Sequence, residues 1–134
     1  DIKNLPFKFS SNDDSLVIKL KYKDNTFLFT GDITKRTEKI LIKNGDALKV
    51  DLLKVPNHGS LYSSSDIFLD KVEPKIGVIT GGTVRLVRYS HPRLFRRYKK
   101  RGIKLISTQR EGAIIVRSNG YTLKIRSFKD KKID

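Results

Sequence analysis

The sequence predicts an α/β fold: a mixed β-sheet with flanking helices, about half of an αββα sandwich. Three observations lead to this prediction. Short apolar segments alternate with helical segments through the middle of the chain, hairpin patterns lie at both ends, and Gly, Pro or Asn mark the turns between them. With 134 residues, the chain is long enough to bury a core as a single domain.

The N-terminal part predicts a hairpin and then a helix. Residues 15–22 begin apolar and then alternate, and residues 26–29 follow after a Lys-Asp-Asn turn, so we expect two paired strands. Thr34 can cap a helix that runs to an Asn-Gly pair, with Ile40 and Leu41 on its inward face.

The central part predicts two strands separated by a helix. Residues 50–55 carry apolar side chains on both faces, which predicts a strand covered on both sides. A helix is expected at residues 64–72, where Ser63 and Asp66 have the spacing of a capping box. A buried strand at residues 76–80 follows.

The C-terminal part predicts one helix and three strands. The helix starts at His91-Pro92, ends at a glycine, and places three apolar residues on one face. The strands are expected at residues 103–106, 113–116 and 121–125, and residues 129–134 form a charged tail that we expect to be frayed.

Two of the predicted strands end in residues that can do chemistry. Asp32 follows a glycine after the strand that ends near residue 30, and His58 lies in the Pro-Asn-His-Gly-Ser turn after residues 50–55. A rigid sheet can direct such loop residues into one cleft. Each residue also has an ordinary interpretation, because an Asp after a Gly is commonly a turn or capping residue and a single loop His commonly has no special role.

Four phrases of the sequence occur together in a known family: FLFTGDI, LKVPNHGS followed by SSS, SHP before a helix, and EGAI. Through them the chain, over residues 15–115, resembles the C-terminal metallo-β-lactamase-like domain of the ComEC family, membrane proteins that bring DNA into competent bacteria. The resemblance implies half of a metallo-β-lactamase αββα sandwich. It also implies metal-dependent phosphodiester hydrolysis in a DNA-uptake protein.

The resemblance further implies a site with two divalent metal ions, Zn or Mn. Asp32 would be the bridging carboxylate and His58 a ligand, which makes both catalytic residues, and His91 would be a further metal-site residue. Zn and Mn both accept such nitrogen and carboxylate ligands. The serines at 63–65 either donate to a phosphate or, as is more common, cap the helix that follows.

The metal-binding half of the family pattern is absent from this sequence. The chain has two histidines in total and no H-x-H-x-D-H motif, so it corresponds to the second half of such a domain and should be inactive alone. Local differences include Asn57, where relatives usually have a second His, and Gln109, where they often have an Asp that could orient a metal-bound His.

Charge points to a polyanion as partner. Lys and Arg number 29 against 14 Asp and Glu, a net charge of +15, and ten basic residues but no acidic one lie in residues 85–110. The expected partners are DNA, in single-stranded form, and the transmembrane portion of the same protein, with no small-molecule cofactor. The expected nucleic-acid-binding residues are Arg85, Arg88, Arg93, Arg96, Arg97 and Arg110.

Two other functions fit the same charge. The chain could be a non-catalytic DNA-binding module or degenerate domain, or a basic surface that rests on an anionic membrane. The chain has no cysteine and no apolar run near the roughly 18–20 residues of a membrane span. The resemblance implies a soluble domain of a bacterial membrane protein, on the extracytoplasmic side.

Overall fold

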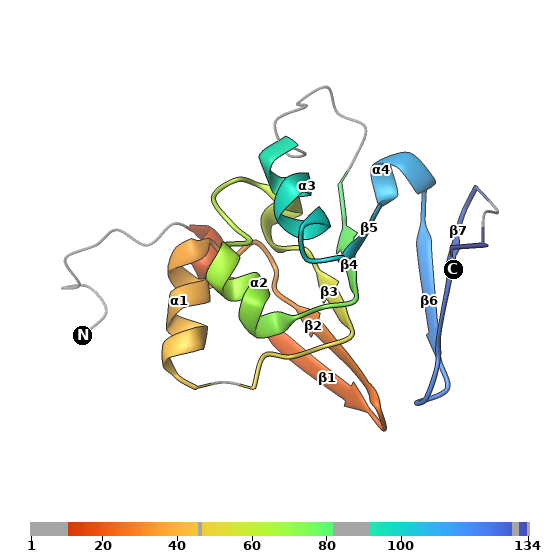
Figure 1. The fold of residues 1–134 in the computed structure, drawn as a ribbon, viewed down its shortest axis with the longest axis horizontal. Helices are drawn as coiled ribbons and strands as arrows, with labels where there is room; N and C mark the ends of the chain where they lie inside the picture. The colour runs from red at the N-terminus through yellow and green to blue at the C-terminus, as the bar shows by residue number, and fades with distance from the viewer. Residues whose placement is uncertain (1–10, 46, 82–91, 130–131, 134) are drawn as a thin grey trace.

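Two β-sheets form the framework of the protein (Figure 1). The computed structural model describes residues 11–45, 47–81, 92–129 and 132–133. The larger sheet has the order β1-β2-β3-β4-β5, in which β1 is antiparallel to β2 and the other pairs are parallel. Its strands are β1 (Ile18–Tyr22), β2 (Asn25–Phe29), β3 (Leu52–Lys54), β4 (Ile76–Ile79) and β5 (Lys104–Ser107). The antiparallel second sheet contains β6 (Ile114–Ser118), β7 (Leu123–Ser127) and β8 (Lys132–Ile133), the last within the charged segment at the C-terminus.

Helices connect the parallel strands. They are α1 (Lys35–Lys43), α2 (Asp66–Val72) and α3 (Pro92–Lys99), and short helical turns occur at α4 (Thr108–Glu111), Ser11–Asp14 and Pro56–Gly59. In Figure 1, α1, α2 and α3 lie on one side of the larger sheet and the second sheet lies on the other. The mixed α/β fold predicted from the sequence, half of an α/β sandwich, is therefore confirmed.

The core is divided by the larger sheet into two clusters. Leu28 and Leu53 belong to the cluster beneath the helices, together with Phe68, Leu94 and Tyr98. Their strand neighbours Phe27 and Leu52 belong to the second cluster, which also takes Ile125 from β7. Because consecutive strand residues point to opposite faces, β3 is covered on both sides as predicted.

Three local predictions differ from the structure. On α1 the expected inward residue Ile40 is 41% exposed, and the fully buried residue is Glu38. Helix α2 begins one residue after its cap Ser65, whose side chain accepts from the Phe68 N–H, so Ser63 is not the cap. Helix α4 was not expected, because its four residues offer no hydrophobic period.

Within the residues that the structure describes, no helix combines the length and the apolar character needed to cross a bilayer.

Candidate functional site

Asp32 and His58 lie side by side at one edge of the larger sheet. Strands β2 and β3 are parallel neighbours, with Phe29 opposite Lys54, so the turns that follow them leave the sheet at the same edge. His58 Nε2 is 3.3 Å from Asp32 Oδ2. The structure thus joins two residues that the sequence separates by more than two dozen positions. Carboxyl ends of parallel strands are a common place for binding sites.

The turn before Asp32 depends on glycine. Gly31 has a φ of +54°, and a Cβ placed on it would lie 2.6 Å from the Ser15 Cβ. The Asp32 N–H donates to Ser15 Oγ at 2.9 Å. Ser15 thus holds the main chain of Asp32 in place. A side chain at position 31 would collide with Ser15, so this turn requires glycine.

The turn that carries His58 contains two residues in the left-handed region. Asn57 has a φ of 47° and His58 a φ of 52°. Asn tolerates this conformation better than most residues, which is a physical reason for Asn at position 57. The Asn57 N–H donates to the Gly31 carbonyl at 3.2 Å, so the two turns hold each other. Strained backbone of this kind often occurs at functional sites.

A main-chain carbonyl orients the His58 ring. His58 Nδ1 is 2.6 Å from the Thr80 carbonyl oxygen at the end of β4. A carbonyl can only accept, so Nδ1 carries a proton, and in the neutral ring Nε2 is then an acceptor.

Nε2 of His58 and Oδ2 of Asp32 are consequently two acceptors that face each other. Their 3.3 Å contact becomes favourable when a second ring proton or a cation lies between them. The side chains are 42% and 36% exposed, so this position is open to solvent on one side. The arrangement can bind a proton or a metal ion.

Lys54 is a third member of the site. Its Nζ donates to the Gly31 carbonyl at 2.7 Å and is 3.3 Å from Asp32 Oδ1. The side chain is only 17% exposed. Lys54 was not among the predicted site residues, although a lysine at the end of an otherwise apolar strand, four residues before His58, was a usable signal.

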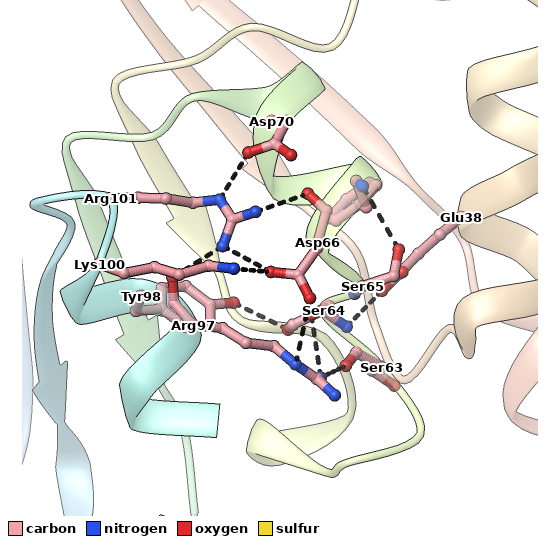
Figure 2. Close-up of polar contacts among 11 residues, drawn as sticks. Glu38, Ser63, Ser64, Ser65, Asp66, Asp70, Arg97, Tyr98, Lys100 and Arg101 are labelled. Atoms are coloured by element: carbon pink, nitrogen blue, oxygen red, sulfur yellow. Dashed lines mark hydrogen bonds and ion pairs between the residues drawn. The ribbon is translucent and has the colours of Figure 1, made fainter. Parts of the chain in front are cut away.

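The serines at 63–65 are used inside the protein (Figure 2). Ser63 Oγ donates to the Ile33 carbonyl at 2.7 Å, and Ser64 Oγ is 2.8 Å from the Tyr98 hydroxyl. The N–H groups of Ser64 and Ser65 donate to the two carboxylate oxygens of Glu38. The capping interpretation holds for Ser65, which caps α2, whereas the hydroxyl groups of Ser63 and Ser64 bond to other parts of the protein.

Burial raises the pKa of Glu38, and the N–H groups of Ser65 and Ser64 act in the opposite direction. Glu38 was not predicted to be buried either. Its signal was position, since Glu38 precedes Leu41 and Ile42 by three and four residues and shares their helix face.

The predicted DNA-binding arginines have different environments. Arg93 and Arg96 are exposed on α3, and Arg110 is exposed near the Phe95 ring, 5.9 Å from its centre. Arg97 instead points into the network of Figure 2, where it donates to the carbonyls of Ser63 and Ser64, both at 3.2 Å. Arg85, Arg88 and His91 lie outside the described residues.

Arg101 joins the same network through the α2 carboxylates. It contacts Asp66 at 2.8 Å and Asp70 at 2.6 Å, and Lys100 contacts Asp66 at 2.7 Å. These hydrogen bonds lower the pKa of both carboxyl groups. The positive charge that follows α3 is thus partly matched inside the protein.

In the part of the chain that the structure describes, no group of three or more His, Cys, Asp or Glu residues is placed to hold a metal ion. The candidate centre therefore consists of Asp32 and His58, with Lys54 beside them. Such a pair can supply at most part of the ligands that a metal ion requires.

The fold and the site define an α/β protein with an acid–imidazole pair at the carboxyl ends of its parallel strands. No family model matches the chain. The chain is 33% identical over 104 residues to "Competence protein ComA" of Neisseria gonorrhoeae, across 77% of this chain and 15% of that protein. It is 28% identical over 109 residues to "ComE operon protein 3" of Bacillus subtilis, across 81% and 14%.

"Recombination protein 2" of Haemophilus influenzae is 27% identical over 122 residues, across 91% of this chain and 15% of that protein. The chain thus spans about one-seventh of the length of these curated relatives. Their names agree with the resemblance to competence proteins of the ComEC type that the motifs carry.

Proposed function

We propose that this chain is part of a metal-dependent, nuclease-like domain of a bacterial DNA-uptake protein. The observation that carries the proposal is the Asp32–His58 pair, whose facing acceptors can hold a cation between them. The similarity to two proteins named for competence and to one named for recombination supports the DNA-uptake role. The chain spans a small part of each relative. The proposal therefore includes a membrane-embedded portion of the same protein, with this domain on its extracytoplasmic side.

The geometry of the pair fits one shared divalent cation. Two ligand atoms on one tetrahedral Zn²⁺, with bonds of about 2.0–2.2 Å, lie about 3.3–3.5 Å apart. The separation between His58 Nε2 and Asp32 Oδ2 is 3.3 Å. Zn²⁺ and Mn²⁺ both accept an imidazole nitrogen and a carboxylate oxygen. Such an ion would activate water for attack on a phosphodiester.

The chain's own residues have distinct parts in this function. Asp32 and His58 would hold the ion, and the Thr80 carbonyl fixes the ring so that Nε2 faces the carboxylate. His91 would contribute as a further site residue. Arg93, Arg96 and Arg110, with Arg85 and Arg88, would hold the backbone of single-stranded DNA. Arg97 has no part in this, because it donates to the carbonyls of Ser63 and Ser64. The remaining ligands must come from other parts of the protein.

Cleavage of single-stranded DNA by the intact protein, in a titration with Mn²⁺ and Zn²⁺, tests this function. Asp32→Ala should abolish cleavage and metal binding. Asp24→Ala, at an exposed position in the β1–β2 turn, is the matched control and should leave both unchanged. Full cleavage by the Asp32→Ala variant would contradict the proposal.

A second candidate function is a binding module that holds DNA without cutting it. The net charge of +15 favours it, and so does the lack of a group of three metal-ligating residues within the described part of the chain. Each phosphate contact contributes a slope of roughly 0.7–0.9 to the dependence of log affinity on log salt. Arg96→Gln should reduce this slope, whereas Lys43→Gln, at the end of α1, should not.

The third possibility is a basic surface on an anionic membrane. It differs from the second in its binding partner, which would be lipid and not DNA. Co-sedimentation with phosphatidylserine vesicles, compared with binding to single-stranded DNA at equal salt, distinguishes them. Vesicle binding without DNA binding would favour the membrane surface.

A further inference from the structure

An open groove lies between helix α3 and β5, the last strand in the order of the larger sheet. It has a volume of about 430 Å³, toward the small end of the range of about 300–1,000 Å³ that is typical of ligand sites. The groove thus has room for one small ring system. Its described lining consists of Phe95, Arg96, Lys99, Gly102, Ile103 and Leu105.

The charged side chains of the groove have one sign. Arg96 and Lys99, the charged members of the described lining, are both basic and both exposed. Arg101, by contrast, lies against the carboxylates of α2, as Figure 2 shows. The groove therefore combines apolar side chains with a basic rim, which is complementary to a ligand that has both apolar and anionic parts.

Phe95 gives the groove an aromatic surface. Its side chain packs against the core cluster beneath the helices but is only partly buried. The guanidinium carbon of Arg110 lies over the ring, 5.9 Å from its centre, so a cation from an exposed side chain reaches this face. Aromatic rings and guanidinium planes are the surfaces on which unpaired nucleobases stack.

The aromatic end of the groove lies near the edge of the sheet that carries the acid–imidazole pair. Strands β4 and β5 are parallel, so both end at this edge. Beyond their ends, the Thr108 hydroxyl accepts from the Gly81 N–H and donates to the Gly81 carbonyl, both at 2.9 Å. Arg110 belongs to the same short helix as Thr108, and it is Arg110 that lies over Phe95. A strand that reaches the pair can therefore continue along α3.

We propose that this groove is a subsite for single-stranded nucleic acid, in which an unpaired nucleobase stacks on Phe95 while Arg96 and Lys99 contact the neighbouring phosphates. The proposal rests on the DNA-binding part of the function proposed above and adds a physical basis for selecting single strands. In a duplex each base is paired and stacked within the helix, so none reaches the ring unless it is first extruded.

Binding of a thymidine oligonucleotide to the intact protein, without added metal, tests the subsite. Phe95→Leu keeps an apolar side chain against the core but removes the aromatic face, so single-strand affinity should fall by about fivefold or more. Affinity for a duplex of equal length should not change. Phe95→Tyr keeps the ring and should retain the affinity. Phe128→Leu is the matched control, because Phe128 is 79% exposed and follows β7.

Salt dependence separates stacking from charge. Arg96→Gln and Lys99→Gln should each reduce the slope of log affinity against log salt by roughly 0.7. Phe95→Leu should leave the slope unchanged, because it removes no charge. An oligonucleotide that carries 5-iodouracil should form a photochemical crosslink to Phe95, identified by mass spectrometry.

The outcomes distinguish this proposal from the proposed function. Unchanged single-strand affinity in Phe95→Leu, or an equal loss in Phe128→Leu, would overturn the subsite, and cleavage that depends on Asp32 would still stand. Equal losses for single strand and duplex would also contradict it. Binding that depends on Phe95 in a protein that cleaves no DNA would refute the nuclease and leave the subsite in place. Binding to phosphatidylserine vesicles that depends on Phe95, without binding to the oligonucleotide, would assign the groove to lipid and end the proposal.

Discussion

The groups of polar side chains around Glu38 and around Asp32 differ in how the carboxylate is matched. Glu38 is fully buried, and both of its oxygens accept from backbone N–H groups of Ser64 and Ser65. Asp32 is about one-third exposed, and one of its oxygens faces the acceptor nitrogen of His58. A buried carboxylate with matched donors stabilises a fold, whereas a half-exposed one facing another acceptor is prepared to bind a cation.

The network around Glu38 joins three helices, as Figure 2 shows. Glu38 comes from α1, the serines precede α2, and Tyr98 of α3 reaches Ser64 through its hydroxyl. Among the described residues, no buried side-chain nitrogen or oxygen is without a hydrogen-bond partner. The contrast between the two groups predicts opposite responses to substitution.

The largest effect is expected for Glu38→Ala. The variant leaves the buried N–H groups of Ser64 and Ser65 without acceptors, so the free energy of unfolding should fall by about 3 kcal/mol. Urea unfolding measures the change. Glu73→Ala, which removes an exposed ion pair with Lys49, is the control and should cost well under 1 kcal/mol. Equal effects of the two substitutions would show that the network is not stabilising.

A smaller loss is expected for Tyr98→Phe. Only the hydroxyl is removed, and with it the hydrogen bond to Ser64 Oγ, so the free energy of unfolding should fall by about 1 kcal/mol. Tyr62→Phe is the matched control, because Tyr62 is 77% exposed. Thermal and urea unfolding of both variants check the prediction, and an unchanged Tyr98→Phe variant would contradict it.

The pH dependence of stability should have opposite signs at two carboxylates. Burial raises the pKa of Glu38, so its contribution to stability is fully present below its ordinary pKa and declines as the pH rises through the raised value. The advantage of the unmodified protein over Glu38→Gln should therefore shrink as the pH increases from about 4.

Asp51 supplies the opposite case. Burial alone would raise its pKa, but hydrogen bonds from Lys75 and Thr26 outweigh burial and lower it. Its contribution is present above its ordinary pKa and is lost as the pH falls, so the difference between the unmodified protein and Asp51→Asn should shrink toward acid pH. Urea unfolding at a series of pH values measures both trends, and parallel trends would refute the assignment.

The smallest effect on stability is expected for Asp32→Asn. The amide introduced at position 32 can donate a hydrogen bond to His58 Nε2, so the two groups are no longer both acceptors. The free energy of unfolding should therefore change by less than about 0.5 kcal/mol. Metal affinity of the intact protein should nevertheless fall by at least about tenfold, because a ligand is lost. A large loss of stability would place Asp32 with Glu38 among the structural carboxylates.

Much of the fold could be predicted because its signals are local. The hairpin of β1 and β2, the Thr34 cap of α1 and the apolar stripe of α3 follow from period, turn residues and capping. Glu38 was missed because an acid on the apolar face of a helix contradicts the hydrophobic period. Only tertiary structure shows which donors satisfy it.

The candidate site could be predicted in part for the same reason. Strand ends identify Asp32 and His58, and parallel pairing of β2 and β3 brings them together. The position of Lys54 at the end of its strand was a usable signal. Its bond to the Gly31 carbonyl and the bond from His58 to the Thr80 carbonyl could not be predicted, since each joins segments that are far apart in the chain. The individual roles of the basic residues likewise depend on which carbonyls and carboxylates lie within reach.

The hydrogen bond from His58 to the Thr80 carbonyl has a consequence for engineering. A main-chain oxygen is present whatever residue occupies position 80, so no exchange of side chains there can delete the acceptor that sets the ring's tautomer. Tuning the basicity of this imidazole by directed evolution would require a shift of the end of β4 itself. The tautomer of the His58 ring thus depends on the position of the end of β4, and a substitution at position 80 leaves the acceptor in place.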